Sequence, residues 1–422
     1  MRYCPVACAS AVQRGCAGRG RLGPLLRSLV WPLLLALVAP LLAGCATAPA
    51  AIATGPLLRD PLYRAPAAAL PSDQQLLSLS PAMRDFLAGE GQALSPLRDP
   101  RRALIDALYR SQAPGVAGLR LEYESTRTRT AAEAFEARAG NCLSLVMMTA
   151  AFARHLELTV SYQSVRVEEY YTRAGTLTLA SGHVNLVLGP RTARGTLDRS
   201  DPDLLVVDFL SPRDTRQQRS LPLQEATIVA MYFNNRAAEL MAAGHLDDAY
   251  WHAREALRHD PGFLHAVNTL GVVHQRAGHL DAAEAAFRQV LARDDRAVAA
   301  LGNLAALLHS RGRGAESAVL ARRLADLQPE PPFHWLRLGR AALAAGDAAR
   351  AVELLQRELR RQPEQDEVHF ALAEALLRQG EFARAQHHLA RAASFSTRQA
   401  DQRRYESKLA HLRAALRPAA LP

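Results

Sequence analysis

A 34-residue period governs the last third of this 422-residue chain. Five glycines follow the period, and a small residue lies five positions after each, alanine in four units and Ser317 in the remaining one. Three units also carry a proline at the same position of the period, and Asp295 occupies that position in a fourth unit. One unit of this length cannot bury its own apolar face, so the period predicts helix pairs that stack into a solenoid. The glycines are Gly244, Gly278, Gly312, Gly346 and Gly380.

The repeated unit resembles the tetratricopeptide repeat, with a small residue such as Gly271 on its first helix and a large one such as Phe287 on its second. The resemblance implies an all-α solenoid of five repeats over residues 230–399, closed by a capping helix at 400–417, and a groove that binds a protein or peptide. Amide and guanidinium side chains in the groove suit a peptide backbone or carboxylates, although an ordinary solvated helix face is the alternative. These side chains are Asn234, Asn268, Asn303, Arg337, Arg340 and Arg378.

The first 44 residues have the pattern of an export signal. Basic residues precede an apolar run at 29–43 that is short for a membrane span. The sequence LAGC, which ends at Cys45, resembles the lipobox of bacterial lipoproteins. The resemblance implies removal of residues 1–44, a lipid on Cys45, and attachment to the outer membrane facing the periplasm. An ordinary signal peptide or an uncleaved anchor is the alternative. Residues 45–72 are rich in Ala and Pro and predict an extended tether.

Charge and cysteine content narrow the possible ligands. The net charge of +10 falls to +5 when the five arginines of the leader are removed, so no nucleic-acid partner is expected. Three of the five cysteines leave with the leader and Cys45 carries the lipid, so Cys142 is the single remaining thiol. The sequence has no HExxH, CxxC or phosphate-binding glycine loop, and we therefore predict neither a metal nor a cofactor.

Cys142 stands where a helix is expected to begin. Gly140 permits a turn, Asn141 is a good N-cap, and apolar residues then recur at helical spacing. The free N–H groups and the dipole of the first helical turn stabilise a thiolate, the form in which cysteine attacks a carbonyl. A buried structural cysteine is the alternative.

Two expected strands supply the partners of such a thiol. Residues 181–189 carry His183 near their start, and residues 204–210 carry Asp208 near their end. If the strands pair antiparallel, the two side chains become neighbours. A carboxylate fixes the tautomer of an imidazole, which can then exchange a proton with the thiol. The alternatives are a satisfied structural histidine and a turn-forming aspartate.

The stretches TRTAAEAFEARAGNCLSLVMMTAAFARHL, GHVNLVL and LLVVDF resemble the core of bacterial transglutaminase-like proteins over residues 120–212. The resemblance implies an α+β, papain-like domain, which with a helical lead-in spans 73–225. It makes Cys142 the nucleophile, His183 the general base and acid, and Asp208 the residue that orients His183. The backbone N–H of the nucleophile would form part of the oxyanion hole. Candidates for its second donor, each also compatible with a cap or a solvated position, are Asn141, Gln163 and Asn185.

Together these features predict a lipid-anchored envelope protein whose cysteine site cleaves or transfers amide bonds while the repeats recruit a partner. Abundant water favours hydrolysis, as in a cysteine peptidase or amidase, over acyl transfer. One alternative is a non-catalytic repeat scaffold or assembly factor with an inactive transglutaminase-like domain. Another is an enzyme directed at the stem peptides of peptidoglycan.

Overall fold

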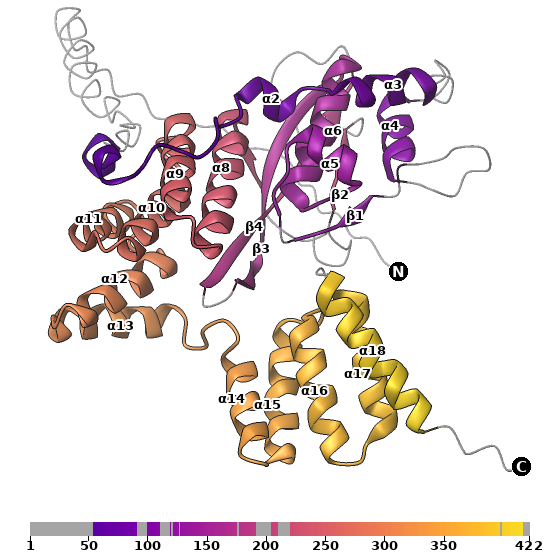
Figure 1. Ribbon diagram of the computed structural model, residues 1–422, viewed down its shortest axis with the longest axis vertical. Helices are drawn as coiled ribbons and strands as arrows, with labels where there is room; N and C mark the ends of the chain where they lie inside the picture. The colour runs from indigo at the N-terminus through magenta and orange to yellow at the C-terminus, as the bar shows by residue number, and fades with distance from the viewer. Residues whose placement is uncertain are drawn as a thin grey trace, which may run out of the picture. The chain divides into compact units, whose positions relative to one another are not determined.

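The computed structural model describes residues 54–90, 99–109, 119, 121–125, 127–174, 177–190, 204–209, 220–396 and 399–416, and Figure 1 draws them as ribbons. The predicted leader and Cys45 lie outside the described residues. No helix within the described ranges is long and apolar enough to cross a membrane.

Short helices lead into an antiparallel sheet. Before the sheet come η1 (Gly55–Leu57), η2 (Asp60–Leu62), α2 (Asp73–Leu77), α3 (Pro81–Glu90), α4 (Pro100–Tyr109), β1 (Glu122–Tyr123), α5 (Ala131–Ala137), β2 (Ala139–Gly140) and α6 (Cys142–His155). The sheet contains β3 (Thr159–Ala174), β4 (Leu177–Gly189), β5 (Leu205–Val207) and β6 (Ser220–Leu223) in the order β5-β4-β3-β6. All three strand pairs in this sheet are antiparallel. The pairing of β5 with β4 is the one that the two sequence patterns predict.

Helix α6 is the core of this part of the chain. Every side chain from Leu143 to Ala153 is buried, which is the pattern of a helix enclosed on all sides. Its apolar side chains share one core with Leu186 and Leu188 of β4. This region therefore combines helices with an antiparallel sheet, and its assignment to the papain-like fold stays a prediction.

The C-terminal half is all-helical, as the period predicts. Its helices are α8 (Glu225–Ala242), α9 (Leu246–His259), α10 (Leu264–Arg276), α11 (Leu280–Leu291), α12 (Val298–Ser310), α13 (Gly314–Leu327), α14 (His334–Ala344), α15 (Ala348–Arg361), α16 (Asp366–Arg378), α17 (Phe382–Phe395) and α18 (Gln399–Ala415). The first of these helices begins at Glu225, before the expected boundary at residue 230. Each glycine of the period follows the first helix of a repeat with φ between +76° and +87°, a conformation that glycine adopts without strain.

The small and large positions of the repeat meet between the two helices. A Cβ placed on Gly271 would lie 2.6 Å from the ring of Phe287, which is fully buried. A Cβ on Gly302 of α12 would lie 3.6 Å from Leu324, an ordinary contact. Replacing each of these two glycines with alanine should therefore have opposite effects on the stability of the repeats.

We expect Gly271→Ala to destabilise the repeats by about 1–3 kcal/mol, because the buried ring has no room to move. Gly302→Ala, its matched control, should stabilise by up to about 1 kcal/mol, because alanine favours helix. Urea unfolding followed by circular dichroism measures both. Equal midpoint shifts for the two variants would contradict the packing described.

The second half of the predicted tether is not a free linker. From Gly55 onward it lies on the first two repeats, and we call residues 55–67 the N-terminal strap. The ring of Tyr63 stacks on Tyr250 with centroids 3.9 Å apart, and its hydroxyl is 2.7 Å from Nδ1 of His274. Nε2 of His274 donates to the carbonyl of Leu57 over 3.1 Å. Tyr63 makes these contacts from within an Ala/Pro-rich segment, whose average composition does not indicate that it packs on the repeats.

Backbone groups of the strap are also paired with the repeats. The N–H of Arg59 donates to the hydroxyl of Tyr250 at 2.7 Å, and that hydroxyl donates to Asp60 at 2.6 Å. The amide of Arg64 donates to Asp247 at 3.1 Å, and the amide of Ala67 donates to Asp248 at 2.9 Å. The strap is thus held by side chains of α9 and α10 rather than by apolar contact alone.

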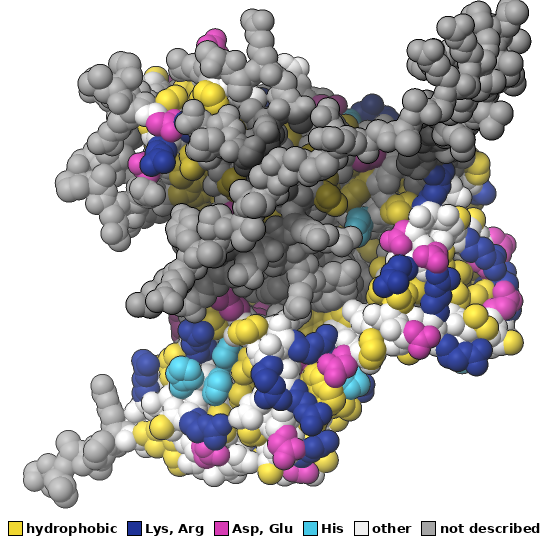
Figure 2. Space-filling view, turned by 180° about the vertical axis from the view of Figure 1, so that it is seen from behind, with side chains coloured by type: hydrophobic (Ala, Val, Ile, Leu, Met, Phe, Trp, Pro, Cys, Tyr) yellow, Lys and Arg dark blue, Asp and Glu magenta, His cyan; other side chains and the backbone are white. Residues whose placement is uncertain are grey.

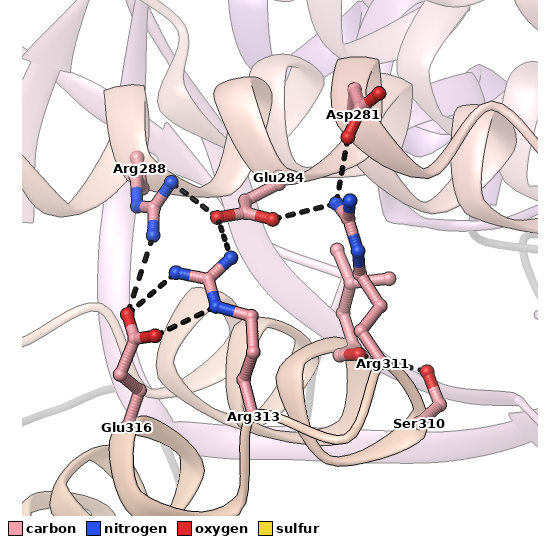
Figure 3. A network of polar contacts seen from close by, with 8 residues as sticks. Asp281, Glu284, Arg288, Ser310, Arg311, Arg313 and Glu316 are labelled. Atoms are coloured by element: carbon pink, nitrogen blue, oxygen red, sulfur yellow. Dashed lines mark hydrogen bonds and ion pairs between the residues drawn. The ribbon is translucent and has the colours of Figure 1, made fainter.

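Charged side chains join the second and third repeats (Figure 3). Glu284 of α11 is buried and accepts from Arg311 at 2.8 Å and from Arg313 at 2.6 Å, and it also pairs with Arg288. Arg313 further pairs with Glu316 at 2.6 Å. Basic and acidic side chains are also interspersed over the repeats on the face in Figure 2. Arg288, Arg311 and Arg313 are each paired with neighbouring carboxylates, as expected for a structural role.

Candidate functional site

The N-terminus of α6 is fixed by a set of buried hydrogen bonds. Oδ1 of Asn141, the N-cap, accepts from the backbone N–H and the hydroxyl of Ser144 at 2.9 and 2.8 Å. The amide nitrogen of Asn141 donates to Thr128 at 2.8 Å. A Cβ on Gly140 would lie 2.8 Å from Cβ of Ser144, so the close approach at this turn requires glycine. Cys142 is consequently held in the first turn, as a free and partly exposed thiol.

His183 lies between Cys142 and Asp208. Its Nε2 is 2.7 Å from Oδ1 of Asp208, and the ring lies close enough to Cys142 for the thiol to influence its pKa. Because Nε2 faces the carboxylate, Nδ1 is the ring nitrogen left for the thiol. Burial alone would lower the pKa of His183, but the interactions with Asp208 and Cys142 outweigh it and raise that pKa to about 9. The protonated imidazole is therefore favoured next to a sulfur that can carry negative charge.

Asn185 contacts the carboxylate from the same strand as His183. Its amide nitrogen donates to Oδ2 of Asp208 at 3.1 Å, so each carboxylate oxygen has a partner from β4. Oδ1 of Asn185 is buried without a hydrogen-bond partner in the described part of the chain. The contact makes Asn185 a positioning residue for Asp208, a role that depends on strand pairing and that we did not predict from the sequence.

The three candidates for the second oxyanion donor have different surroundings. Asn141 caps α6, and Asn185 supports Asp208. Oε1 of Gln163 accepts from the hydroxyl of Ser220 at 3.0 Å, and Gln163 lies directly across the sheet from Asn185. The assignment of an oxyanion donor among them stays a prediction.

We expect Asn185→Ala to lower the pKa of His183, because Asp208 loses the hydrogen bond that fixes its orientation toward the imidazole. NMR titration of the His183 ring measures this pKa. Asn185→Asp is the informative partner variant, because it keeps the shape but places a second carboxylate beside Asp208. An unchanged titration in Asn185→Ala would contradict the positioning role.

The predicted groove residues lie on first helices of the repeats. Asn303 of α12 donates to Asn268 of α10 at 3.1 Å, which joins two neighbouring repeats. Oδ1 of Asn234 on α8 is buried and without a partner among the described residues. Arg340 pairs with Glu367 at 3.3 Å, and Arg378 donates to the carbonyl of Leu343. The amides of Asn268 and Asn303 are thus joined, whereas Arg340 and Arg378 already bind adjacent repeats.

Comparison with known proteins identifies the repeats. Residues 268–332 and 342–412 match models of the tetratricopeptide repeat. The C-terminal part of the chain therefore contains tetratricopeptide repeats, a class of module that generally binds protein partners. No curated protein matches the chain.

Several solved structures are similar to part of this chain. One, described as a functional characterisation of Pseudomonas aeruginosa pilF, is 23% identical, with a TM-score of 0.28, and covers 45% of this chain and 87% of its own. TTC0263, a thermophilic TPR protein of Thermus thermophilus, is 22% identical, with a TM-score of 0.28, and the match covers 43% of this chain and 99% of TTC0263. A structure of the MamA protein is 16% identical, with a TM-score of 0.23, and the match covers 46% of this chain and 98% of the MamA chain.

Proposed function

We propose that this protein combines a cysteine site for acyl transfer with a repeat array that binds a protein or peptide. The observation that supports the cysteine site is the position of His183, which hydrogen-bonds Asp208 and interacts electrostatically with Cys142. The matches to tetratricopeptide repeats support the binding array.

In the proposed reaction the thiolate of Cys142 attacks a carbonyl carbon, and a C–S bond forms as the carbonyl oxygen takes up the electron pair. His183 then gives its proton to the leaving nitrogen, the C–N bond breaks, and a thioester remains. Neutral His183 next takes a proton from water as its oxygen attacks the thioester, and the C–S bond breaks to release a carboxylic acid and the thiolate, which restores the starting pair of thiolate and protonated His183. Asp208 keeps the imidazole oriented in each step, and an amine in place of water would give transfer.

A simple ester tests this chemistry without knowledge of the natural substrate. The full chain is mixed with p-nitrophenyl acetate, nitrophenolate release is followed optically, and acetylated protein is measured by intact mass. We expect one acetyl group per chain on Cys142, none there in Cys142→Ser, and slow formation in His183→Ala. Equal acetylation at Cys142 in the wild type and His183→Ala would reject a histidine-assisted nucleophile.

A non-catalytic scaffold is the second candidate, and the repeat matches favour it directly. In this function the sheet and α6 form a folded platform, and the array carries the binding activity. The ester experiment separates the two candidates, because a scaffold requires no reactive thiol.

The groove proposal has its own test. Fluorescent peptides of mixed sequence are prepared with either a free or an amidated C-terminus, and binding is measured by anisotropy. We expect the peptide with a free carboxylate to bind more tightly than the amidated one. We also expect Asn268→Ala to lose binding, since the side-chain amide of Asn268 would donate to that carboxylate. Binding that is unaffected by Asn268→Ala and Asn303→Ala would place the peptide elsewhere.

Attachment through a lipid on Cys45 is also part of the proposal. It is supported by the apolar run at 29–43 and by the LAGC sequence that ends at Cys45. Metabolic labelling with a palmitate analogue should mark the wild type but not Cys45→Ser. Labelling that persists in the variant would reject Cys45 as the lipidated residue.

A further inference from the structure

The repeat array is interrupted at one junction. The second helix of a repeat packs against the first helix of the next at α9–α10, α11–α12 and α15–α16. Within the described ranges, α13 and α14 do not pack in this way. A solenoid is stabilised by contacts between neighbouring repeats, so this junction lacks its usual stabilisation.

Side chains on α14 are exposed where the other repeats bury them. Trp335 and Leu338 are partly exposed. Residues one period earlier, Leu301 and Leu304, are 0% and 3% exposed. One period later, His369 and Leu372 are 5% and 1% exposed. This face of α14 therefore matches a packed face in sequence register but does not pack against α13 within the described ranges.

Helix α13 has the complementary feature. Ala321 is exposed and Leu324 is partly exposed. The residues in register with Ala321, Phe287 and Leu355, are fully buried. Val319 on the same helix is 56% exposed, among the largest exposures of a large apolar residue in the described chain. The open junction thus leaves unpacked surface on both helices.

The start of α14 is displaced relative to the period. Helices α10, α12 and α16 begin at Leu264, Val298 and Asp366, so the period places the start of α14 at Pro332. The helix begins instead at His334, and Phe333 before it has φ +57°. Proline is well suited to the first position of a helix, so the sequence permits the earlier start. The left-handed conformation of Phe333 is unfavourable for a side chain with a Cβ.

Burial of Phe333 holds this displaced start. The ring is 5% exposed and lies in a cluster with Leu336 and Leu343. In the helical register its equivalents are His265, Ala299 and Glu367, which are exposed or partly exposed. Nearby, Trp335 Nε1 donates to Glu330 at 2.9 Å. An aromatic residue on the solvent side of a helix would lose this burial, so Phe333 favours the open junction.

We propose that the array has a second, closed state in which α14 begins at Pro332 and packs against α13. The occupant of the α13 surface is α14 of the same chain, because Gly312 and Gly346 keep the 34-residue spacing of stacked repeats. Closing buries the two unpacked faces and relieves the backbone of Phe333, but it removes that ring from its cluster. These opposing contributions create two discrete arrangements that a bound partner can select.

The stacked junctions supply the contacts expected on closing. Phe287 of α11 clusters with Leu304, Leu307 and Leu308 of α12. Leu355 of α15 clusters in the same way with Leu372, Ala375 and Leu376 of α16. Shifted by the period, these contacts place Ala321 of α13 against Leu338, Ala341 and Ala342 of α14.

Disulfide trapping tests the closed state in the full chain, with its five native cysteines replaced by serine. Ala321→Cys is combined with Ala342→Cys, and the matched control combines Ala321→Cys with Ala344→Cys on the exposed side of α14. Dilute protein is oxidised and the bond is located by mass spectrometry. We expect a bond within one chain for the first pair only. Equal yields for both pairs, or bonds only between chains, would overturn the proposal.

Phe333→Ala tests the residue that holds the junction open. It introduces the residue found one period earlier and should speed trapping about tenfold or more by shifting the population toward the closed state. Phe333→His, the residue two periods earlier, replaces it if the alanine variant is not folded by circular dichroism. An unchanged trapping rate in a folded Phe333 variant would overturn the role of this side chain.

Discussion

Replacing Tyr63 with alanine is expected to lower the free energy of unfolding of the repeats by about 3–5 kcal/mol, the usual cost of deleting a buried aromatic side chain. The ring is 7% exposed and stacks on Tyr250. Its loss leaves a cavity and also removes the hydroxyl bonded to His274. Urea unfolding of the full chain, followed by circular dichroism, measures the change.

Tyr63→Phe is the matched control. It keeps the stacked ring but leaves Nδ1 of His274 without its donor, which should cost about 1–3 kcal/mol. The order of stability is then wild type, Tyr63→Phe and Tyr63→Ala. If Tyr63→Ala were as stable as the wild type, the strap would not be docked on the repeats in solution.

Acid should weaken the same contact. Burial, with His279 and Arg59 nearby, lowers the pKa of His274 to about 4 from 6.5. The folded state therefore favours the neutral ring, and its contribution to stability is present above pH 6.5 and lost as the pH falls through about 4. We expect the stability difference between wild type and Tyr63→Ala to shrink between pH 7 and pH 4. A difference that is constant with pH would contradict the neutral ring.

Asp208→Asn is expected to slow alkylation of Cys142 by iodoacetamide at neutral pH by about 10- to 100-fold, because the protonated imidazole that stabilises a thiolate is lost. Burial opposes protonation of His183, and the interactions with Asp208 and Cys142 raise its pKa to about 9. An amide in place of Asp208 removes the negative partner. Intact mass after timed labelling measures the rate.

The contribution of His183 to stability changes with pH in the opposite direction to that of His274. Because the folded pKa of His183 is raised above its ordinary value of 6.5, its contribution is fully present below pH 6.5 and is lost as the pH rises through about 9. Asp208→Asn should therefore destabilise the protein more at pH 6 than at pH 9.5. Asp326→Asn, at an exposed position on α13, is the matched control and should leave labelling unchanged. Equal labelling rates in the two variants would contradict an imidazole–carboxylate pair that acts on the thiol.

Features set by local spacing were predictable from the sequence. The glycines of the period end first helices in a left-handed conformation, and Asn141 caps the helix that carries Cys142. The pairing of His183 with Asp208 also followed, because alternating patterns limit how two short strands can align. In each case a short sequence pattern determines the local geometry.

Features that depend on distant contacts were not predictable. Tyr63 contacts Tyr250, which lies nearly half the chain away in sequence, and an Ala/Pro-rich segment gives no sign of that docking. The role of Asn185 depends on the position of Asp208 on a neighbouring strand. The displaced start of α14 is also hidden, because the period itself continues through Phe333 without a change in spacing. Long-range packing decided each of these outcomes.

The central claim is that His183 activates Cys142, and the pH dependence of alkylation by iodoacetamide tests it most directly. The full chain and His183→Ala are labelled from acid to alkaline pH, and Cys142 is quantified by peptide mass. The account predicts rapid labelling of the wild type near neutral pH, with His183→Ala reactive only in alkali like an ordinary thiol. Superimposable profiles would contradict the account and leave the repeats as the functional part of the protein.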